Sequence, residues 1–513
     1  MAIALCLSML ATDMIVKQKN GEDWKINVDD VEEVVFEKTI PEDSTVVDAS
    51  ETFLKFKILS DSTAKILVAL SKRDSENINI PAKVRIDGNI YTVTNIAKCA
   101  FCERILDSVK IPSTVTEIEG GFAFGYLTNI TVADDNPAYS SLNGILYDKD
   151  KTEIIRVPEV FKGDFEIPSS VKGIGEYAFY GCSNLTSINI PDGVTSIGEY
   201  AFEGCHSLAS INIPEGVTTI GNSAFNYCDN LTNISIPSSV KGIGEYAFYG
   251  CSNLTSIKIA DGVTSIGEYA FEGCKSLTSI EIPESVTNIG VEAFSGCSSL
   301  TSIKIPKGVT SIESSTFGGC ESLNSINIPE GVTSIGRSAF RGCKSLTSIN
   351  IPEGVTDIGY GVFKNCSRLT SIDIPENVTS IGNSAFEGCS SLASINIPKG
   401  VTSIGVGVFY ECSSLISINI PEGVTSIGNK AFYECSKLTS IDIPESVTNI
   451  GDWAFWRCSS LTSINIPKGV TNIGYGVFKN CTNLDVVIDN SENNVTVGED
   501  AFEGCKSVKW IKD

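Results

Sequence analysis

Apolar and polar residues alternate in short segments that return at a fixed spacing along most of this chain. In residues 185–190 (LTSINI), the apolar positions 188 and 190 alternate with the polar positions 187 and 189. This period of two is typical of a β-strand with one buried face. Pro191 ends the segment, because proline has no N–H to donate to a neighbouring strand. The pattern therefore predicts a short, half-buried strand.

The rest of the same unit predicts a second strand and a corner. Residues 194–197 (VTSI) follow the turn residue Gly193, and Gly198 permits the next bend. Residues 201–205 (AFEGC) form a segment too short for a stable helix. We expect this segment to form one α-helical or 3₁₀ turn. Each unit is thus predicted to contain two strands on opposite sides and a helical corner.

The unit recurs every 23 residues. Fourteen cysteines from Cys182 to Cys481 keep this spacing without an insertion, and Cys505 follows after 24 residues. A phenylalanine precedes each of these cysteines by three positions. Successive strands are joined by crossovers of about 17 residues, so neighbouring strands must be parallel. The period predicts a solenoid in which like side chains stack, for example Phe202 on Phe225.

Departures from the period divide the chain into segments. Residues 2–11 are apolar but far shorter than the roughly 20 residues of a membrane-spanning helix. We interpret residues 1–13 as a truncated export signal, with an ordinary buried segment as the alternative. The alternation in residues 50–92 predicts an antiparallel N-terminal β cap. The solenoid is expected over residues 93–513, with a hairpin-like insertion at about 133–160, regular coils at about 165–489 and a C-terminal capping coil at 490–513.

The repeated motif IPxGVTSIGxxAFxGCxxLTSIxIP resembles the BspA-like leucine-rich repeats, also called the Treponema type. Residues 136–155 (NPAYSSLNGILYDKDKTEII) are similar to a recurrent element of that family, and the resemblance covers about residues 76–513. Residues 14–49 begin with a segment similar to the N-termini of exported Bacteroidetes proteins. The resemblance implies a leucine-rich-repeat solenoid, bacterial surface display, adhesion to host proteins or other cells, and no enzymatic activity.

Composition narrows the function further. The net charge of −24 argues against nucleic acid or anionic lipid as the main partner, because both attract positive charge. His206 is the single histidine of the chain, which removes most general-base, catalytic-triad and zinc-ligand arrangements. A site built from carboxylates alone stays open. We expect neither a cofactor nor an enzyme.

The cysteines have a structural interpretation. Fifteen of them occupy one repeat position, where a small buried apolar side chain is wanted, and parallel Cβ directions in adjacent coils suit a disulfide badly. We therefore expect buried free thiols. Cys99 and Cys102 form a lone CxxC motif without a partner motif, for which core packing is favoured over metal binding.

The outward positions of the first strand are the predicted ligand surface. One column is almost entirely serine, and the other varies with a charge near zero, so together they offer hydroxyl and amide groups to a protein or a glycan on the expected concave side. The alternative is that they only keep the sheet soluble. The candidate residues are Ser187, Asn189, Ser210, Asn212, Lys258, Glu281, Lys304, Asn327, Asn350, Asp373, Asn396, Asn419, Asp442 and Asn465.

A second candidate surface is the pair Trp453 and Trp456 with Arg457. Aromatic and arginine side chains in one place have the composition of an interaction hot spot. Local packing is the alternative interpretation.

Three functions are consistent with these features. The leading hypothesis is a secreted or cell-surface adhesion scaffold that binds extracellular proteins or glycans through many repeated contacts, with no nucleic-acid partner. A dedicated glycan-binding module and an intracellular interaction scaffold are the alternatives. The oligomeric state is left open.

Overall fold

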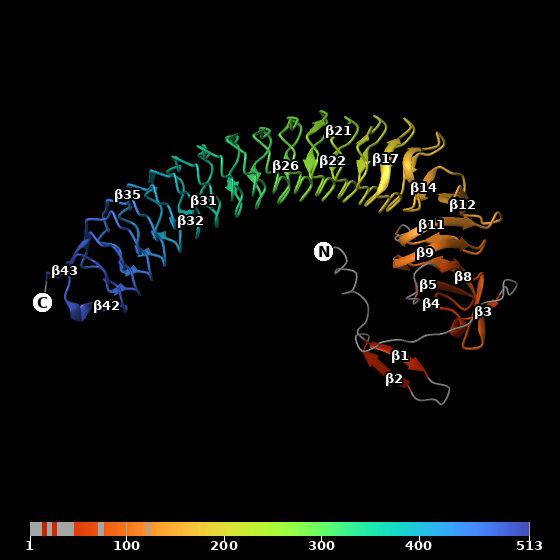
Figure 1. The fold of residues 1–513 in the computed structure, drawn as a ribbon, viewed down its shortest axis with the longest axis horizontal. Helices are drawn as coiled ribbons and strands as arrows, with labels where there is room; N and C mark the ends of the chain where they lie inside the picture. The colour runs from red at the N-terminus through yellow and green to blue at the C-terminus, as the bar shows by residue number, and fades with distance from the viewer. Residues whose placement is uncertain are drawn as a thin grey trace.

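The computed structural model describes residues 13–17, 23–27, 46–69, 76–98, 100–120 and 124–511. Stacked coils form a long arc, with a small β unit at its N-terminal end (Figure 1). The predicted parallel solenoid is confirmed: Ile188 lies beside Ile211, and Ile197 beside Ile220, in the pairing of adjacent coils. The core of the arc is one continuous apolar cluster.

Most coils contribute one strand to each of two sides. The first side consists of β15 (Lys162–Glu166), β17 (Asn184–Asn189), β19 (Ser210–Ile211), β21 (Asn233–Ile236), β23 (Ser256–Ile259), β25 (Ser279–Ile280), β27 (Ser302–Lys304), β29 (Ser325–Asn327), β33 (Ser394–Asn396), β35 (Ser417–Asn419), β37 (Ser440–Ile441), β39 (Ser463–Ile466), β41 (Asp485–Ile488) and β43 (Ser507–Trp510). These strands are shorter than the alternation predicts, and the coils of Asn350 and Asp373 keep only an isolated bridge between these residues.

The second side consists of very short strands. They are β14 (Glu153–Arg156), β16 (Gly173–Ile174), β18 (Ser196–Ile197), β20 (Thr219–Ile220), β22 (Gly242–Ile243), β24 (Ser265–Ile266), β26 (Asn288–Ile289), β28 (Ser311–Ile312), β30 (Ser334–Ile335), β31 (Asp357–Ile358), β32 (Ser380–Ile381), β34 (Ser403–Ile404), β36 (Ser426–Ile427), β38 (Asn449–Ile450), β40 (Asn472–Ile473) and β42 (Thr496–Val497).

The corner between the two sides is not the predicted helical turn. Separate i→i+3 hydrogen bonds, such as Glu203 N to Tyr200 O and Cys205 N to Phe202 O, form successive β-turns. Tyr200 has a φ of 56°, in the left-handed region, which interrupts any helix. The N–H of Phe202 donates instead to Ala224 O in the next coil. The turn therefore acts as a third ladder between coils.

Buried side chains stack as the period predicts. The phenylalanine rings, from Phe179 to Phe502, lie parallel with centroids 5.0 to 6.0 Å apart. Each cysteine thiol from Cys205 to Cys481 donates to the carbonyl of a phenylalanine in the preceding coil, as from Cys205 Sγ to Phe179 O at 3.2 Å, whereas Cys182 donates to Val157 O and Pro158 O. The expectation of free, buried thiols is confirmed for the cysteines from Cys182 to Cys481, and Cys505 is half-buried.

The turns form the inner side of the arc. Hydrogen bonds from the phenylalanine N–H groups to the next coil measure 2.7 to 3.0 Å, as from Phe202 to Ala224. The corresponding bonds at the start of the first strands measure 2.9 to 3.5 Å, as from Thr278 to Thr255. Coils are closest together on the inner side of a curved stack, so the turns lie inside and the first strands lie away from the concave side.

The N-terminal unit is a mixed sheet where the alternation predicts an antiparallel one. Two antiparallel hairpins, β4 with β5 and β7 with β8, are joined by the parallel pair β5 and β8. The strands of this mixed sheet are β3 (Val46–Asp48), β4 (Leu54–Ile58), β5 (Thr63–Ala69), β7 (Lys83–Ile86), β8 (Asn89–Ile96) and β10 (Glu117–Ile118). A separate parallel sheet contains β6 (Glu76–Asn79), β9 (Phe101–Ile111) and β11 (Phe124–Val132). The 3₁₀ helix η4 (Ala49–Glu51) follows β3.

The insertion is a hairpin, as its sequence indicates. β12 (Tyr139–Leu142) and β13 (Ile145–Asp148) pair antiparallel across Asn143 and Gly144, both with positive φ. Buried Asn136 donates to Pro112 O and Val115 O and thereby fastens the insertion to the unit before it. The apolar core divides at this place into a small N-terminal cluster and the long cluster of the arc.

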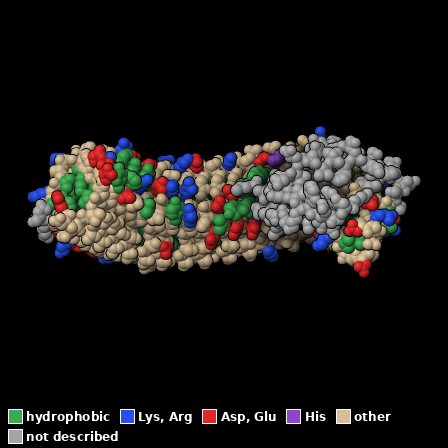
Figure 2. Space-filling view, turned by 90° about the horizontal axis from the view of Figure 1, so that it is seen from below, with side chains coloured by type: hydrophobic (Ala, Val, Ile, Leu, Met, Phe, Trp, Pro, Cys, Tyr) green, Lys and Arg blue, Asp and Glu red, His purple; other side chains and the backbone are tan. Residues whose placement is uncertain are grey.

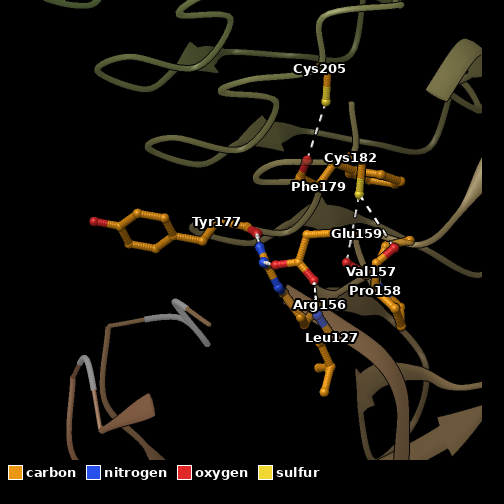
Figure 3. A network of polar contacts seen from close by, with 9 residues as sticks. All are labelled: Leu127, Arg156, Val157, Pro158, Glu159, Tyr177, Phe179, Cys182 and Cys205. Atoms are coloured by element: carbon orange, nitrogen blue, oxygen red, sulfur yellow. Dashed lines mark hydrogen bonds and ion pairs between the residues drawn. The ribbon is translucent and has the colours of Figure 1, made fainter. Parts of the chain in front are cut away.

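A buried ion pair joins the two clusters (Figure 3). Arg156 Nη2 contacts Glu159 Oε1, and Arg156 Nη1 donates to Tyr177 O at the first turn of the regular coils. Glu159 Oε2 accepts from Leu127 N of β11 at 2.8 Å. Both side chains are at most 4% exposed, so each depends on the other for its solvation.

The last coil contains η5 (Glu492–Asn494) before β42, and β43 ends the first side. Residues 1–12, and residues 18–22 and 28–45 of the predicted segment 14–49, lie outside the described residues. The described parts of that segment include an antiparallel pair, β1 (Asp13–Lys17) with β2 (Asp23–Asn27). Cys99 and the side chain of Cys102 are also outside the description.

Candidate interaction surface

The predicted strand columns point outward, away from the core. All of the named serine, asparagine and charged positions are exposed except Ser187, which is half-buried. They lie on the first side, which leaves the concave side to the turns, so the expectation of a concave strand platform is wrong. Lys304 pairs with exposed Glu284 at 2.6 Å, and Lys258 lies beside Glu281. The columns form a long polar surface whose ligand role stays a prediction.

The concave side presents two groups of aromatic residues instead. Figure 2 views this side and shows green side chains among red ones beside the single purple histidine, with blue side chains further toward the C-terminal end. We call the turn residues of the first group the N-terminal turn surface. Its aromatic and charged members are Glu176, Tyr177, Tyr180, Glu199, Tyr200, Glu203, Tyr227, Glu245, Tyr246, Tyr249, Glu268, Tyr269 and Glu272.

Tyrosines of the N-terminal turn surface stack in two pairs. Tyr177 and Tyr200 lie 4.7 Å apart between ring centroids with an interplanar angle of 3°, and Tyr246 and Tyr269 lie 4.6 Å apart at 10°. The coil between the pairs has Ser223 at this position, which is buried between them. The repeat geometry thus turns one repeat position into a column of rings, because adjacent coils place equivalent side chains in contact.

Two glutamates of this surface are partly withdrawn from water. Burial raises the pKa of Glu203 to about 7, although a hydrogen bond with Asn226 opposes the shift. Burial and the nearby Glu292 charge raise the pKa of Glu272 to about 7 as well. Within the described part of the chain, Glu203 Oε2 has no hydrogen-bond partner. A cation at this surface would relieve that unfavourable burial.

A small hollow of about 270 Å³ adjoins Glu203 and is lined also by Tyr180, His206 and Tyr227. His206 Nδ1 lies 2.6 Å from Asp229 Oδ2. The hollow combines two aromatic rings with a carboxylate, which is the composition that attracts an organic cation.

The second group, the C-terminal turn surface, carries its own cations. Its members are Arg337, Arg341, Tyr360, Lys364, Glu387, Tyr410, Glu411, Lys430, Tyr433, Glu434, Asp452, Trp453, Trp456, Arg457, Tyr475 and Lys479. Tyr410, Tyr433 and Trp456 stack at 4.6 and 4.4 Å. The Arg457 guanidinium lies 4.0 Å from the Trp456 ring centroid, and Lys430 lies 5.4 Å from that of Trp453.

The predicted tryptophan site is therefore partly exposed but already engaged. Trp453 meets Tyr475 edge-on at 5.1 Å, and Arg457 is also paired with Glu434 at 3.0 Å. An adjoining groove of about 550 Å³ is lined by Glu411, Glu434 and Arg457 together with serines of successive coils. Trp453, Trp456 and Arg457 are thus brought into one cluster with neighbours from the adjacent coils.

The repeat matches a family model over most of its length. The model for the BspA type leucine rich repeat region, in 6 copies, matches residues 73–158, 162–278, 264–393 and 379–509. The chain belongs to the BspA-type leucine-rich-repeat family. No curated protein matches it.

Solved structures of bacterial leucine-rich-repeat proteins are similar to this BspA-type chain. One from Bacteroides ovatus is 30% identical, with 84% of this chain and 98% of that one covered and a TM-score of 0.49. A leucine rich cell surface protein from Faecalibacterium prausnitzii is 30% identical, covering 80% and 92%, with a TM-score of 0.37. The T. pallidum leucine rich repeat protein is 32% identical over 38% of this chain and 82% of its own, with a TM-score of 0.29.

Sequence reasoning missed the tyrosine columns of this BspA-type array. They occupy the variable positions of the motif, in IGxxAF and AFxGC, which carry no signal for strand or core. A signal was nevertheless present: tyrosine follows glutamate at 176–177, 199–200, 245–246 and 268–269. Reading the variable positions down the columns of the repeat, instead of along the chain, finds both turn surfaces.

Metal ligation and thiol chemistry have little support in the described residues. They contain no group of three or more His, Cys, Asp or Glu side chains placed to hold a metal ion. Burial raises the pKa of the ladder thiols, to about 12 at Cys320, so these cysteines stay protonated and unreactive. The described residues also include no helix with the length and apolarity needed to cross a bilayer.

Proposed function

We propose that this BspA-type chain is a non-enzymatic adhesion or interaction protein, secreted or displayed at a bacterial cell surface, that binds macromolecules of host or neighbouring cells. The family is consistent with a protein-interaction scaffold. The observation that carries the proposal is the pair of turn surfaces, which present aromatic and charged side chains on many successive coils. Repeated contacts of this kind favour multivalent ligands, since bound neighbours raise the effective concentration of the next site.

A protein partner fits these surfaces better than a glycan. A sugar ring stacks on an open aromatic face, but Trp456 is stacked on Tyr433 and covered by Arg457. The strand columns, from Ser187 and Asn189 to Asn465, add hydroxyl and amide groups along the first side. We propose them as a secondary contact surface.

Deletion of whole coils tests the extended mode of binding. Removing residues 277–322 joins Ser276 to Leu323 in register and takes away two coils that carry neither turn surface. We expect this variant to bind immobilised extracellular-matrix proteins and whole cells nearly as well as the intact chain. Deletions that remove part of a turn surface should weaken binding in steps. Absence of binding by the intact chain, or an equal loss from every deletion, would contradict the proposal.

Location is tested separately in the native organism. Protease treatment of intact cells, followed by fractionation, should degrade the chain while cytoplasmic proteins survive. Protection until the cells are broken would favour the intracellular scaffold.

A further inference from the structure

A lysine of the N-terminal unit already contacts Glu176 and Tyr177, the first glutamate–tyrosine pair of the N-terminal turn surface. We call the two residues at this repeat position in each coil a rung. Lys98 Nζ lies 3.1 Å from Glu176 Oε1 and 6.0 Å from the centroid of the Tyr177 ring. A carboxylate and an aromatic face both attract an ammonium group. The pair Glu176–Tyr177 therefore receives a lysine side chain within this molecule.

The same pair occurs three more times, as Glu199–Tyr200, Glu245–Tyr246 and Glu268–Tyr269. Residues 236–257 repeat the sequence of residues 167–188 without a change. The backbone repeats too, since φ is 60° at Tyr177 and 55° at Tyr246, and both tyrosines stack on the tyrosine of the next coil. The second copy thus reproduces the sequence, the backbone and the tyrosine stacking of the pair that holds Lys98.

The three further pairs have no cation of their own within the described part of the chain. No lysine or arginine there forms an ion pair with their glutamates or lies over their rings. The C-terminal turn surface is different, because Arg337, Lys430 and Arg457 lie over its aromatic rings. The N-terminal surface combines six glutamates with no basic residue at the same repeat positions.

We infer that Glu199–Tyr200, Glu245–Tyr246 and Glu268–Tyr269 bind lysine or arginine side chains of an extended basic segment of a partner protein. Each bound side chain contacts the glutamate of its pair and lies near the tyrosine ring, as Lys98 does at Glu176–Tyr177. The inference rests on the proposed function and names the chemistry of the partner. Three coils separate the first pair from the last, about 14 Å, and an extended segment covers this distance between residues i and i+4. The acidic field of the surface favours the encounter.

The test measures the affinity of the full chain for a labelled peptide by fluorescence anisotropy at low salt. The peptide carries lysines at every fourth position in a serine–glycine background, and its control has glutamine in place of each lysine. The variant combines Glu245→Asn, Tyr246→Ser, Glu268→Asn and Tyr269→Ser. It gives both rungs the residues of the natural rung Asn222–Ser223, where Ser223 has a φ of 55°. We expect an affinity loss of roughly tenfold.

The matched control removes the same charge elsewhere. Glu330→Gln with Glu353→Gln neutralises two exposed carboxylates away from the turns, and we expect less than about a twofold loss from the weaker general field. Lys98→Gln should act in the opposite direction and strengthen binding about twofold, because it frees the rung Glu176–Tyr177. Equal losses in the rung variant and the control, binding of the glutamine peptide, or no gain from Lys98→Gln would overturn the inference.

Binding of the intact chain to cells keeps the two proposals apart. A chain that binds cells but does not discriminate between the peptides overturns the basic-segment inference alone. A chain that binds the lysine peptide but no cell or matrix protein supports the inference and removes the adhesion proposal.

Discussion

The two turn surfaces share one backbone geometry but differ in where the cations beside their aromatic rings come from. In the N-terminal surface the tyrosine pairs stand among six glutamates, and Lys98 and Arg156 come from outside its repeat positions to the first rung. In the C-terminal surface, Arg337 and Lys430 stand in the same columns as the rings of Tyr360 and Trp453 that they cover, and Arg457 comes from the position next to Trp456. In our proposal the first surface therefore takes cations from a partner. In the second surface, cations of the same chain already lie over the aromatic rings.

The difference teaches how this array separates stability from recognition. Phe202 and its equivalents from Phe179 to Phe478 are fully buried, whatever the turn beside them carries. Exposed substitutions away from special features change stability by only about 0.5 kcal/mol. The variable turn positions can therefore diverge along the rod while the core stays uniform.

The largest expected effect comes from breaking the attachment of the N-terminal surface. Arg156→Met leaves Glu159 buried without its partner, which costs about 3–5 kcal/mol, and frees the carbonyl of Tyr177. We expect thermal unfolding by circular dichroism to show an early step for the N-terminal coils, with the C-terminal coils unfolding at their usual temperature. Limited proteolysis should cut first near the insertion.

Its control is the double variant Arg156→Met with Glu159→Met. An apolar pair of similar volume removes both buried charges, so much of the lost stability should return. A single transition at the original temperature in Arg156→Met would show that the junction does not hold the N-terminal coils.

The second effect depends on pH. Burial raises the pKa of Glu203 from 4.5 to about 7, so the folded chain holds this proton more tightly than the unfolded chain. The contribution of Glu203 to the free energy of unfolding is therefore complete below about pH 4.5 and is lost as the pH rises through 7. Glu203→Gln should match the original chain at pH 4 and exceed it at pH 8 by on the order of 2 kcal/mol.

Thermal melts at both pH values check this expectation. The matched control, Glu387→Gln, occupies the same repeat position in the C-terminal surface, where the glutamate pairs with Lys364 at 2.9 Å. It should show no gain at pH 8. A gain of equal size in both variants would mean that the two surfaces do not differ in this respect.

The third effect converts one surface into the other. Lys430→Gln with Arg457→Gln uncovers the rings of Trp453 and Trp456 and leaves Glu434 without its arginine. We expect the C-terminal surface to gain affinity for the lysine peptide, by roughly threefold to tenfold. Fluorescence anisotropy in the background of the N-terminal rung variant measures this gain. No gain would show that internal cations are not what closes the C-terminal surface.

The smallest effect is expected on the first side. Lys304→Gln breaks an ion pair with Glu284 whose side chains are 72% and 51% exposed, and exposed pairs contribute at most about 1 kcal/mol. Thermal unfolding and peptide affinity should both stay nearly unchanged. A large loss of either would move the functional surface from the turns to the strand columns.

The repeat alone predicts most of the arc. The period of 23 residues with alternating Ile188 and Ile190 is enough for parallel strands, and Phe202 and Cys205 follow as ladders because each coil must bury the same positions against its neighbours. The hairpin at Asn143–Gly144 also follows from its turn residues. These features depend on local pattern, which a single sequence contains.

Other features depend on geometry that the pattern does not specify. The left-handed φ at Tyr200 decides between a helical turn and separate β-turns, and a tyrosine in the sequence does not predict a left-handed φ. The concave side results from small differences in coil spacing, which the sequence does not contain, so the prediction that the strand columns of Ser187 and Asn189 face the concave side is wrong. Arg156 and Glu159 lie outside the regular repeat, where no column marks their positions as buried. The ligand roles of the strand columns and the export signal stay predictions.

The cysteine ladder has a consequence for where such a rod can work. Each thiol from Cys205 to Cys481 is enclosed by protein and bonded to a backbone carbonyl, and Cys505 alone is partly open at the end of the array. Oxidants and thiol reagents reach a sulfur only when the coils separate. The ladder thiols from Cys205 to Cys481 can thus pass between reducing and oxidising surroundings without forming cross-links as long as the coils stay stacked.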